Sequence, residues 1–261
     1  EKTFFCFGDK LFFTNTGMKN VHNSIINLLE GHPELNFIND ILRDFPSGEV
    51  YLVGGAIRDA IIGIPVTDFD FVVRGVPSVA LEKWLERHGS VDFVGQRFGV
   101  YKFLPTGCSH DDFEFIDLAL PRTETTIRDS QGGYRDFEIT SHPFLPILYD
   151  LERRDFTMNA IAYEMRSKIL YDPFNGQKDI ERKMVRAVGE PAERFREDLS
   201  RMLRALRFSV QLGFIIGPKT TKALVDNFSQ INEQRIVVGS LVNKMLGRNR
   251  DFVVPRSTIG R

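Results

Sequence analysis

The fold of this chain is decided by the stretch Val50-Tyr51-Leu52-Val53-Gly54-Gly55-Ala56-Ile57-Arg58-Asp59 and by Asp68-Phe69-Asp70, which follows it after a turn. The apolar run at 50–53 predicts a buried strand that stops at the two glycines. A short helix is expected from Ala56 to Ile62, and a second strand from Asp68 to Val73. The sequence therefore predicts a strand, a tight turn, a helix and a second strand that carries two acids.

The Gly54-Gly55 pair is typical of a turn that binds phosphate. Two glycines between a strand and a helix leave backbone N–H groups accessible and let an anion come close to them. Arg58, one turn into the helix, would add a charged fork to the same phosphate. Many Gly-Gly pairs are only turns, so the pattern favours a phosphate site without requiring one.

The carboxylates of the second strand suit divalent cations. In a strand, Asp68 and Asp70 point to one face, with their Cα atoms roughly 7 Å apart. Two like charges among apolar neighbours are unfavourable without a cation, and a pair of metal ions about 4 Å apart supports in-line phosphoryl transfer. Asp117 lies in another apolar strand and could complete a three-carboxylate site, with Glu114 as the less favoured choice. The alternative is a solvent-facing strand edge on which Asp68 caps a turn.

The remaining pattern predicts an α+β fold. A helix is expected over 78–88, and extended segments over 91–95, 99–104 and 112–120. The polar, glycine-containing segment 122–140 predicts a mobile loop. After Asp150 the pattern is mainly helical to about Met245, interrupted by a short extended pair around Tyr163 and residues 169–171.

Two further polar pairs have helical spacing. Asp155 and Asn159 would share a helix face and offer acceptor and donor groups to a ribose hydroxyl; the alternative is ordinary capping. Asp198 and Arg201, at the start of a long predicted helix, combine an acceptor with a fork of donors. That combination matches the edge of cytosine or adenine and rejects uracil and guanine. The alternative is an acid favoured by the helix dipole and paired with a nearby arginine.

Composition sets broad bounds. The chain has 261 residues, 42% of them hydrophobic and 26% charged, which is typical of a globular protein of one or two domains. No apolar run approaches the roughly 20 residues of a membrane helix, so no membrane partner is expected. The two cysteines, Cys6 and Cys108, predict reduced thiols in a cytoplasmic protein. The net charge of -1 neither supports nor excludes an RNA partner.

Taken in order, these motifs resemble the class II tRNA nucleotidyltransferase (CCA-adding enzyme) and poly(A) polymerase family. The resemblance covers about residues 48 to 245. It also rests on the stretches Arg153-Arg154-Asp155-Phe156-Thr157-Met158-Asn159-Ala160, Asp172-Pro173-Phe174-Asn175-Gly176, Asp179-Ile180, Arg186-Ala187-Val188-Gly189, Arg194-Phe195-Arg196-Glu197-Asp198 and Arg204-Ala205-Leu206-Arg207-Phe208.

The resemblance implies a polymerase-β-like nucleotidyltransferase head domain followed by an all-helical neck domain. We expect an N-terminal extension and helix over 1–47, the catalytic head over 48–165 and the neck with its base-recognition helix over 166–246. Residues 247–261 form a tail that is truncated or unassigned. Family members usually continue into body and tail domains that bind tRNA. We therefore expect this chain to be a fragment, to lack segments of the full protein, or to be a naturally small enzyme.

The resemblance also implies roles for single residues. Asp68 and Asp70 would hold Mg²⁺, or Mn²⁺, and Asp117 would join them in catalysis. Gly54, Gly55 and Arg58 would bind the triphosphate. Nucleotide binding is further assigned to Arg154, Asp155 and Asn159 near the sugar, to Asp198 and Arg201 as an amino-acid template for the base, and to Arg204 and Arg207.

The implied reaction is template-independent addition of C and A from CTP and ATP to the 3′ end of tRNA. The stretches Gly95-Gln96-Arg97-Phe98-Gly99-Val100 and Leu120-Pro121-Arg122-Thr123-Glu124 look more like CCA-adding enzymes than poly(A) polymerases. The loop over 122–140 looks like the flexible loop that helps the site change from C to A. The alternatives are a poly(A) polymerase, a CC-only or A-only enzyme, and a catalytically impaired RNA-binding module.

Overall fold

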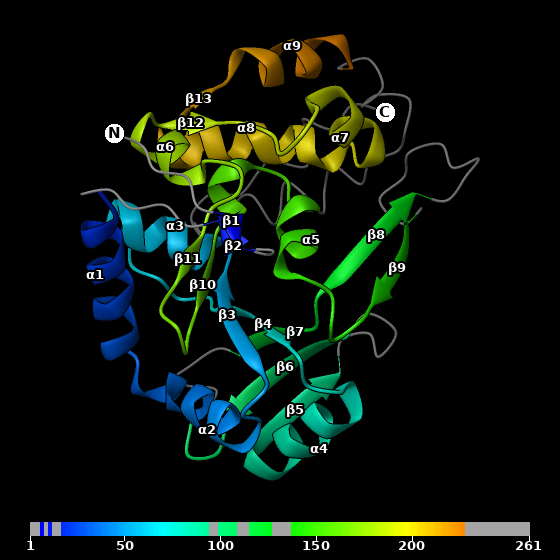
Figure 1. The fold of residues 1–261 in the computed structure, drawn as a ribbon. Helices are drawn as coiled ribbons and strands as arrows, with labels where there is room; N and C mark the ends of the chain where they lie inside the picture. The colour runs from blue at the N-terminus through cyan, green and yellow to red at the C-terminus, as the bar shows by residue number, and fades with distance from the viewer. Residues whose placement is uncertain are drawn as a thin grey trace, which may run out of the picture.

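The computed structural model describes residues 6–7, 10–11, 17–93, 99–108, 115–126 and 137–227. A mixed sheet forms the centre of the molecule, with helices α1 to α4 around it and a second group, α6 to α9, stacked across one end (Figure 1). The predicted α+β class is therefore confirmed. No helix within the described ranges is long and apolar enough to cross a membrane.

Seven of the described strands make up the central sheet, in the order β11-β10-β3-β4-β7-β6-β5. Only β4 and β7 pair in parallel; the other neighbours in this sheet are antiparallel. Their bounds are β3 Glu49–Val53, β4 Asp70–Arg74, β5 Gly89–Phe93, β6 Val100–Pro105, β7 Ile116–Ala119, β10 Ala162–Glu164 and β11 Leu170–Tyr171.

The two faces of the sheet are covered by different elements, as the alternation of side chains along a strand requires. Val50 and Leu52 of β3 belong to the large core formed with α1 Gly17–Glu30, α2 Phe37–Asp44, α3 Gly55–Ile62 and α4 Ser78–His88. Tyr51 and Val53, on the opposite face, pack in a smaller core with α5 Ile147–Glu152. The residues of β3 are therefore buried on both faces, which explains their unbroken apolar run.

The predicted strand–turn–helix unit is confirmed at residues 49–62. The helix α3 ends at Gly63, whose φ of +74° closes it in the left-handed conformation. The second strand differs from the prediction because β4 begins at Asp70, so Asp68 and Phe69 precede it. Phe69 is buried there and contacts the ring of His32 at 4.8 Å between centroids.

The segment predicted to be a mobile loop is partly a β-hairpin. Strands β8 Arg122–Thr126 and β9 Phe137–Ser141 pair in antiparallel register, while residues 127–136 lie outside the described part of the chain. The hairpin extends away from the central sheet beside α5 (Figure 1). Its polar, threonine-rich strands have little apolar alternation, and for this reason the sequence pattern did not indicate them.

The second half of the described chain is mainly helical, as predicted. It contains α6 Gly176–Glu181, α7 Pro191–Glu197, α8 Ser200–Leu212 and α9 Pro218–Asp226, with two short strands, β12 Met184–Val185 and β13 Ile215–Ile216. The predicted extended pair is confirmed as β10 and β11, which extend the central sheet beside β3. The predicted boundary between residues 165 and 166 therefore falls in the turn between two strands of one sheet, and a division into head and neck stays a prediction.

Near the N-terminus, β1 Cys6–Phe7 and β2 Lys10–Leu11 form a short antiparallel pair. Residues 228–261, which include the predicted tail, lie outside the described part of the chain.

Candidate functional site

The turn at Gly54 brings three kinds of group together. Gly54 has a φ of +76° and a ψ of -135°, a region of backbone space that glycine occupies at little cost. A Cβ atom at this position would lie 2.7 Å from Arg154 Nη1 and 3.3 Å from Asp70 Oδ2. The start of α3, one guanidinium group and one carboxylate therefore meet at a position where only glycine fits.

A second guanidinium group lies on the other side of the turn. A Cβ atom at Gly55 would lie 3.4 Å from Arg58 Nη2. Arg58 is buried and already donates hydrogen bonds to both carboxylate oxygens of Asp59 at 2.9 Å and to Asn159 Oδ1 at 2.6 Å. The Gly54-Gly55 turn thus lies between Arg58 and Arg154, an arrangement that favours an anion at the N-terminus of α3.

Asp70 and Asp117 project from neighbouring strands to the same face of the sheet. They are direct partners in the parallel pairing of β4 with β7, which is the arrangement of strands that a joint site of Asp70 and Asp117 requires. The residues next to them in sequence, Phe71 and Leu118, point into the large core. Both acids therefore face the side of the sheet on which α5 packs.

Asp70 lies in an environment that opposes its negative charge. Asp70 as a residue is exposed to solvent, but the protein around its carboxyl group displaces enough water to raise the pKa of that group. The guanidinium group of Arg154 counteracts this rise, and Asp117, Asp68 and Asp150 add to it. A carboxylate under these influences gains stability from a divalent cation. The chemistry of the donors, carboxylate oxygens, suits Mg²⁺ and Mn²⁺.

The predicted cluster of three carboxylates is not assembled within the described ranges, where no three side chains of His, Cys, Asp or Glu are grouped so as to hold a metal ion. Asp117 Oδ1 is buried without a hydrogen bond and lies 3.4 Å from Nζ of Lys102, its partner across the β6–β7 pair. Asp68, before β4, is exposed. A catalytic role for Asp117 stays a prediction, and its alternative, Glu114, lies outside the described residues.

Asp150, in α5, joins this site although the sequence analysis did not select it. It is fully buried and accepts hydrogen bonds from Arg153 at 2.6 Å and from Arg154 at 2.9 Å. Burial opposes ionisation of this carboxyl group, but the two guanidinium groups outweigh it and lower the pKa. The spacing of Asp150 to Arg153 and Arg154, i to i+3 and i+4 at the end of a helix, was the available signal.

Asp155 and Asn159 come together, although not on an α-helix as predicted. Asp155 lies in a bend before a 3₁₀ turn, Thr157–Asn159, and accepts a hydrogen bond of 3.0 Å from Asn159 Nδ2. Its other oxygen accepts 2.7 Å and 2.6 Å contacts from Arg204 of α8. Since Asn159 also accepts the hydrogen bond from Arg58, this buried chain of contacts connects α3 with α8.

The ring of Phe208 lies among three arginines at the same place. The guanidinium carbons of Arg58, Arg204 and Arg207 are 5.1, 5.5 and 4.7 Å from its centroid. Aromatic faces attract such cations. Arg204 and Arg207, predicted to bind nucleotide, therefore lie beside Arg58.

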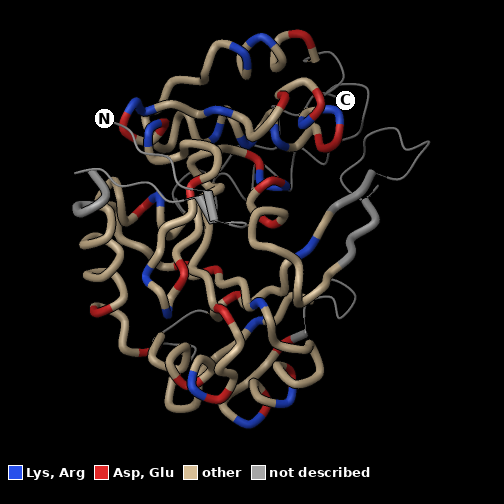
Figure 2. The backbone as a smooth tube through the Cα atoms, in the orientation of Figure 1, with Lys and Arg blue, Asp and Glu red and all other residues tan. Residues whose placement is uncertain are grey.

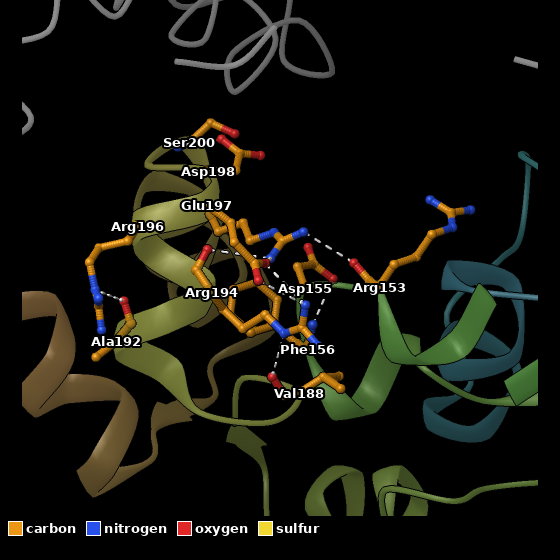
Figure 3. Close-up of polar contacts among 11 residues, drawn as sticks. Arg153, Asp155, Phe156, Val188, Ala192, Arg194, Arg196, Glu197, Asp198 and Ser200 are labelled. Carbon is orange, nitrogen blue, oxygen red and sulfur yellow. Dashed lines mark hydrogen bonds and ion pairs between the residues drawn. The ribbon is translucent and has the colours of Figure 1, made fainter. Parts of the chain in front are cut away.

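Asp198 and Arg201 are neighbours but do not share a helix face as predicted. Asp198 has extended backbone after α7, and its Oδ1 accepts a 2.8 Å hydrogen bond from the backbone N–H of Ser200 at the start of α8. Figure 3 shows Asp198 beside Ser200, apart from the contacts around Glu197. The helix prediction was wrong here because a short polar side chain at a helix start favours capping over helical backbone.

Arg201 is buried and fixed from three sides. It donates hydrogen bonds to Glu197 Oε2 at 2.8 Å and to the carbonyl groups of Arg194 at 3.3 Å and Arg153 at 3.1 Å. The last contact connects α8 to the segment that carries Arg154 and Asp155. Glu197 Oε2 also accepts a 3.0 Å hydrogen bond from Nη1 of Arg194. Glu197 is a second site residue that the sequence did not indicate.

Charged residues of both signs alternate along the helical half. Figure 2 shows Lys and Arg interleaved with Asp and Glu over α6 to α9. The arginines named above are part of this mixture and have acidic neighbours. The small net charge thus reflects local pairing and does not imply that basic residues are few.

Comparison with known proteins gives consistent matches. The model of the poly(A) polymerase head-domain family matches residues 50–186. A CCA-adding enzyme of Lacticaseibacillus paracasei is 38% identical over 181 residues, which cover 69% of this chain and 41% of that protein. Among curated relatives, a multifunctional CCA protein of Xylella fastidiosa is 37% identical over 210 residues, covering 78% of this chain and 45% of that protein.

The solved structure of the Bacillus stearothermophilus CCA-adding enzyme in complex with CTP aligns with a TM-score of 0.61 and 28% identity. The alignment covers 90% of this chain and 49% of that one. The chain thus spans less than half the length of these relatives.

Proposed function

Because the chain belongs to the family of the poly(A) polymerase head domain, in which its relatives are CCA-adding enzymes, we propose that it is a metal-dependent tRNA nucleotidyltransferase. Its substrates in this proposal are CTP and ATP, and the acceptor is the 3′ end of tRNA. The reaction adds C, C and A without a nucleic-acid template.

One observation supports the proposal above the others: the Gly54 turn, Arg154 and Asp70 meet within contact distance. An anion-binding helix start, a cation and an acid in one place are the parts that phosphoryl transfer requires. The Gly54-Gly55 turn receives the triphosphate, with Arg58 on one side and Arg154 on the other.

In this proposal Asp68 and Asp70 hold Mg²⁺ or Mn²⁺. Divalent ions bound there would polarise the attacked phosphate and neutralise charge on the attacking and leaving oxygens. The raised pKa of Asp70 fits a carboxylate that is stabilised by a cation during the reaction. Asp117, opposite Asp70 across the strand pair, is proposed as the third acid, which requires it to leave Lys102.

The sugar is assigned to Asp155 and Asn159. Arg58 holds Asn159, Arg204 holds Asp155, and the two side chains are hydrogen bonded to each other. Their polar atoms would therefore already be oriented when the ribose binds. Arg204 and Arg207 complete the positive surroundings of the nucleotide. This role requires the ribose hydroxyl to share oxygens that already accept hydrogen bonds.

The base is assigned to Asp198 and Arg201 at the junction of α7 and α8. Arg201 is oriented by Glu197 and by the carbonyl of Arg153, so its remaining donors have a fixed direction. The Asp198 carboxylate caps α8 through Oδ1 and would accept the amino group of cytosine or adenine. The division into a head that holds the metal ions and a helical neck that reads the base belongs to the same proposal.

The test is incorporation of each labelled nucleotide, supplied separately, into a tRNA that lacks its CCA end. The proposal expects incorporation of C, then of A onto a tRNA ending in CC, and none of U or G beyond background. Long A tails from ATP alone would favour a poly(A) polymerase, and C alone or A alone a partial enzyme. Binding of tRNA without incorporation of any nucleotide would favour an impaired RNA-binding module.

A further inference from the structure

Asp150 is a buried acid for which the proposed reaction has no direct use. It is completely inaccessible to solvent, whereas its two partners, Arg153 and Arg154, are partly exposed. A buried charge is costly unless it is paired and hydrogen bonded. The Asp150 carboxylate meets this requirement with four contacts, two from each arginine.

The pairing with Asp150 orients the guanidinium group of Arg154 toward the Gly54 turn. Nε and Nη2 of Arg154 donate to Asp150 Oδ2 at 3.3 and 2.9 Å, while Nη1 points to the Gly54 turn and donates to the carbonyl of Asn159 at 3.4 Å. One edge of the guanidinium group is thus used for attachment. The other lies where the triphosphate is proposed to bind and where Arg154 acts on the charge of Asp70.

The surroundings keep Asp150 in place. Ile147 and Leu151 of the same helix pack against Val53 and Val72 on the face of the sheet that carries Asp70. Asp150 is therefore attached to the same rigid sheet as the site. An arginine has several rotatable bonds, and a two-point contact with a fixed carboxylate removes most of its freedom.

We propose that Asp150 is a positioning residue that orients Arg154 toward the triphosphate beside the Gly54 turn. It touches neither substrate nor metal; it acts through Arg154. This inference rests on the proposed function in that the anion is taken to be the triphosphate of CTP or ATP.

The experiment compares KM and kcat for CTP in the wild-type chain, Asp150→Asn, Arg154→Met and the double variant. Loss of a directly coupled contact of this kind changes affinity by about tenfold or more. Asp150→Asn and Arg154→Met should each raise KM for CTP by that factor, and the double variant should raise it no further than Arg154→Met alone. If Asp150→Asn does not fold, the double variant, which removes the charges as a pair, still tests the last expectation.

Asp179→Asn is the matched control. Asp179 is also buried and paired with an arginine, Arg186, at 3.0 Å, and it accepts a 2.7 Å hydrogen bond from Thr157. The Asp179→Asn substitution should lower the melting temperature, while KM for CTP stays at the wild-type value. A KM for Asp150→Asn within twofold of wild type, or a double variant whose effect is the product of the two single effects, would overturn the proposal.

Failure of the proposed function is recognised separately. If the wild-type chain adds no nucleotide, the same variants are compared for binding of inorganic tripolyphosphate by calorimetry. Weaker binding by Asp150→Asn and by Arg154→Met, with no further loss in the double variant, supports the role of Asp150. Equal binding by Asp150→Asn and wild type overturns it.

Discussion

Replacement of Gly54 by alanine should abolish nucleotide addition at a modest cost in stability. The backbone there has φ +76° and ψ -135°, which costs a residue with a side chain about 1–3 kcal/mol. The new methyl group would also lie 2.7 Å from Arg154 Nη1 and 3.3 Å from Asp70 Oδ2, so the arginine must move. The expected loss of activity is at least about a hundredfold, because a small misplacement of reacting groups is enough for this.

Gly63→Ala is the matched control, at the other end of the same helix. Gly63 has φ +74°, but nothing lies within 4 Å of the position of its Cβ atom. The left-handed conformation costs alanine about 1 kcal/mol, or about 2–4 °C in melting temperature for a domain of this size. This variant should therefore lose stability and keep its activity.

The assay pairs a melting curve with the initial rate of CTP incorporation for each variant. We expect both variants to melt below wild type and only Gly54→Ala to lose activity. Activity of Gly54→Ala within a few-fold of wild type would contradict a role for Gly54 in the reaction. An equal loss of activity in Gly63→Ala would contradict it as well, because the loss in Gly54→Ala would then reflect lower stability of the whole protein.

Other variants and conditions give further tests. Asp68→Ala and Asp70→Asn should each lower incorporation at least about a hundredfold, as judged by single-turnover rates. Because the folded-state pKa of Asp70 is raised, Asp70→Asn should unfold at higher urea than wild type at neutral pH, and this gain should vanish below about pH 4. Asp155 behaves in the opposite sense: burial opposes its ionisation, but Arg204 outweighs it and lowers the pKa. Asp155→Asn should therefore be less stable than wild type at neutral pH, with the difference lost as pH falls through the lowered pKa. Activity should require Mg²⁺ or Mn²⁺, and full activity in excess chelator would contradict the metal assignment. Arg201→Ala should reduce the preference for CTP and ATP over UTP and GTP by about tenfold or more, as measured by the incorporation rates of all four nucleotides. An unchanged ratio of these rates, together with a lower melting temperature, would show that Arg201 has only a structural role.

Much of the architecture near the Gly54 turn follows from sequence. An apolar run that ends at two glycines can form little except a buried strand and a turn, and a lone acid in the apolar strand 116–119 had to face away from the core. The parallel pairing that sets Asp117 opposite Asp70 did not follow from the sequence, because Phe71 and Val73 enter one core and Val72 the other, and such a pattern does not select a neighbouring strand.

The rest depended on contacts that spacing does not reveal. The pattern placed Asp198 on a helix because its neighbours continue the helical period, whereas capping of Ser200 interrupts the helix there. It passed over Asp150, whose partner Arg154 was interpreted only as a ligand for the nucleotide. The pairing of Arg58 with Asn159, 101 positions apart, required the fold itself.

Sequencing of the added 3′ ends shows whether this chain completes the CCA end of tRNA. A tRNA lacking its CCA end is incubated with the chain, CTP, ATP and Mg²⁺, and the products are sequenced individually. We expect C, C and A to be added in that order and addition then to stop, with no extension by Asp70→Asn. Ends that remain unextended, or that carry only runs of A, would contradict this expectation.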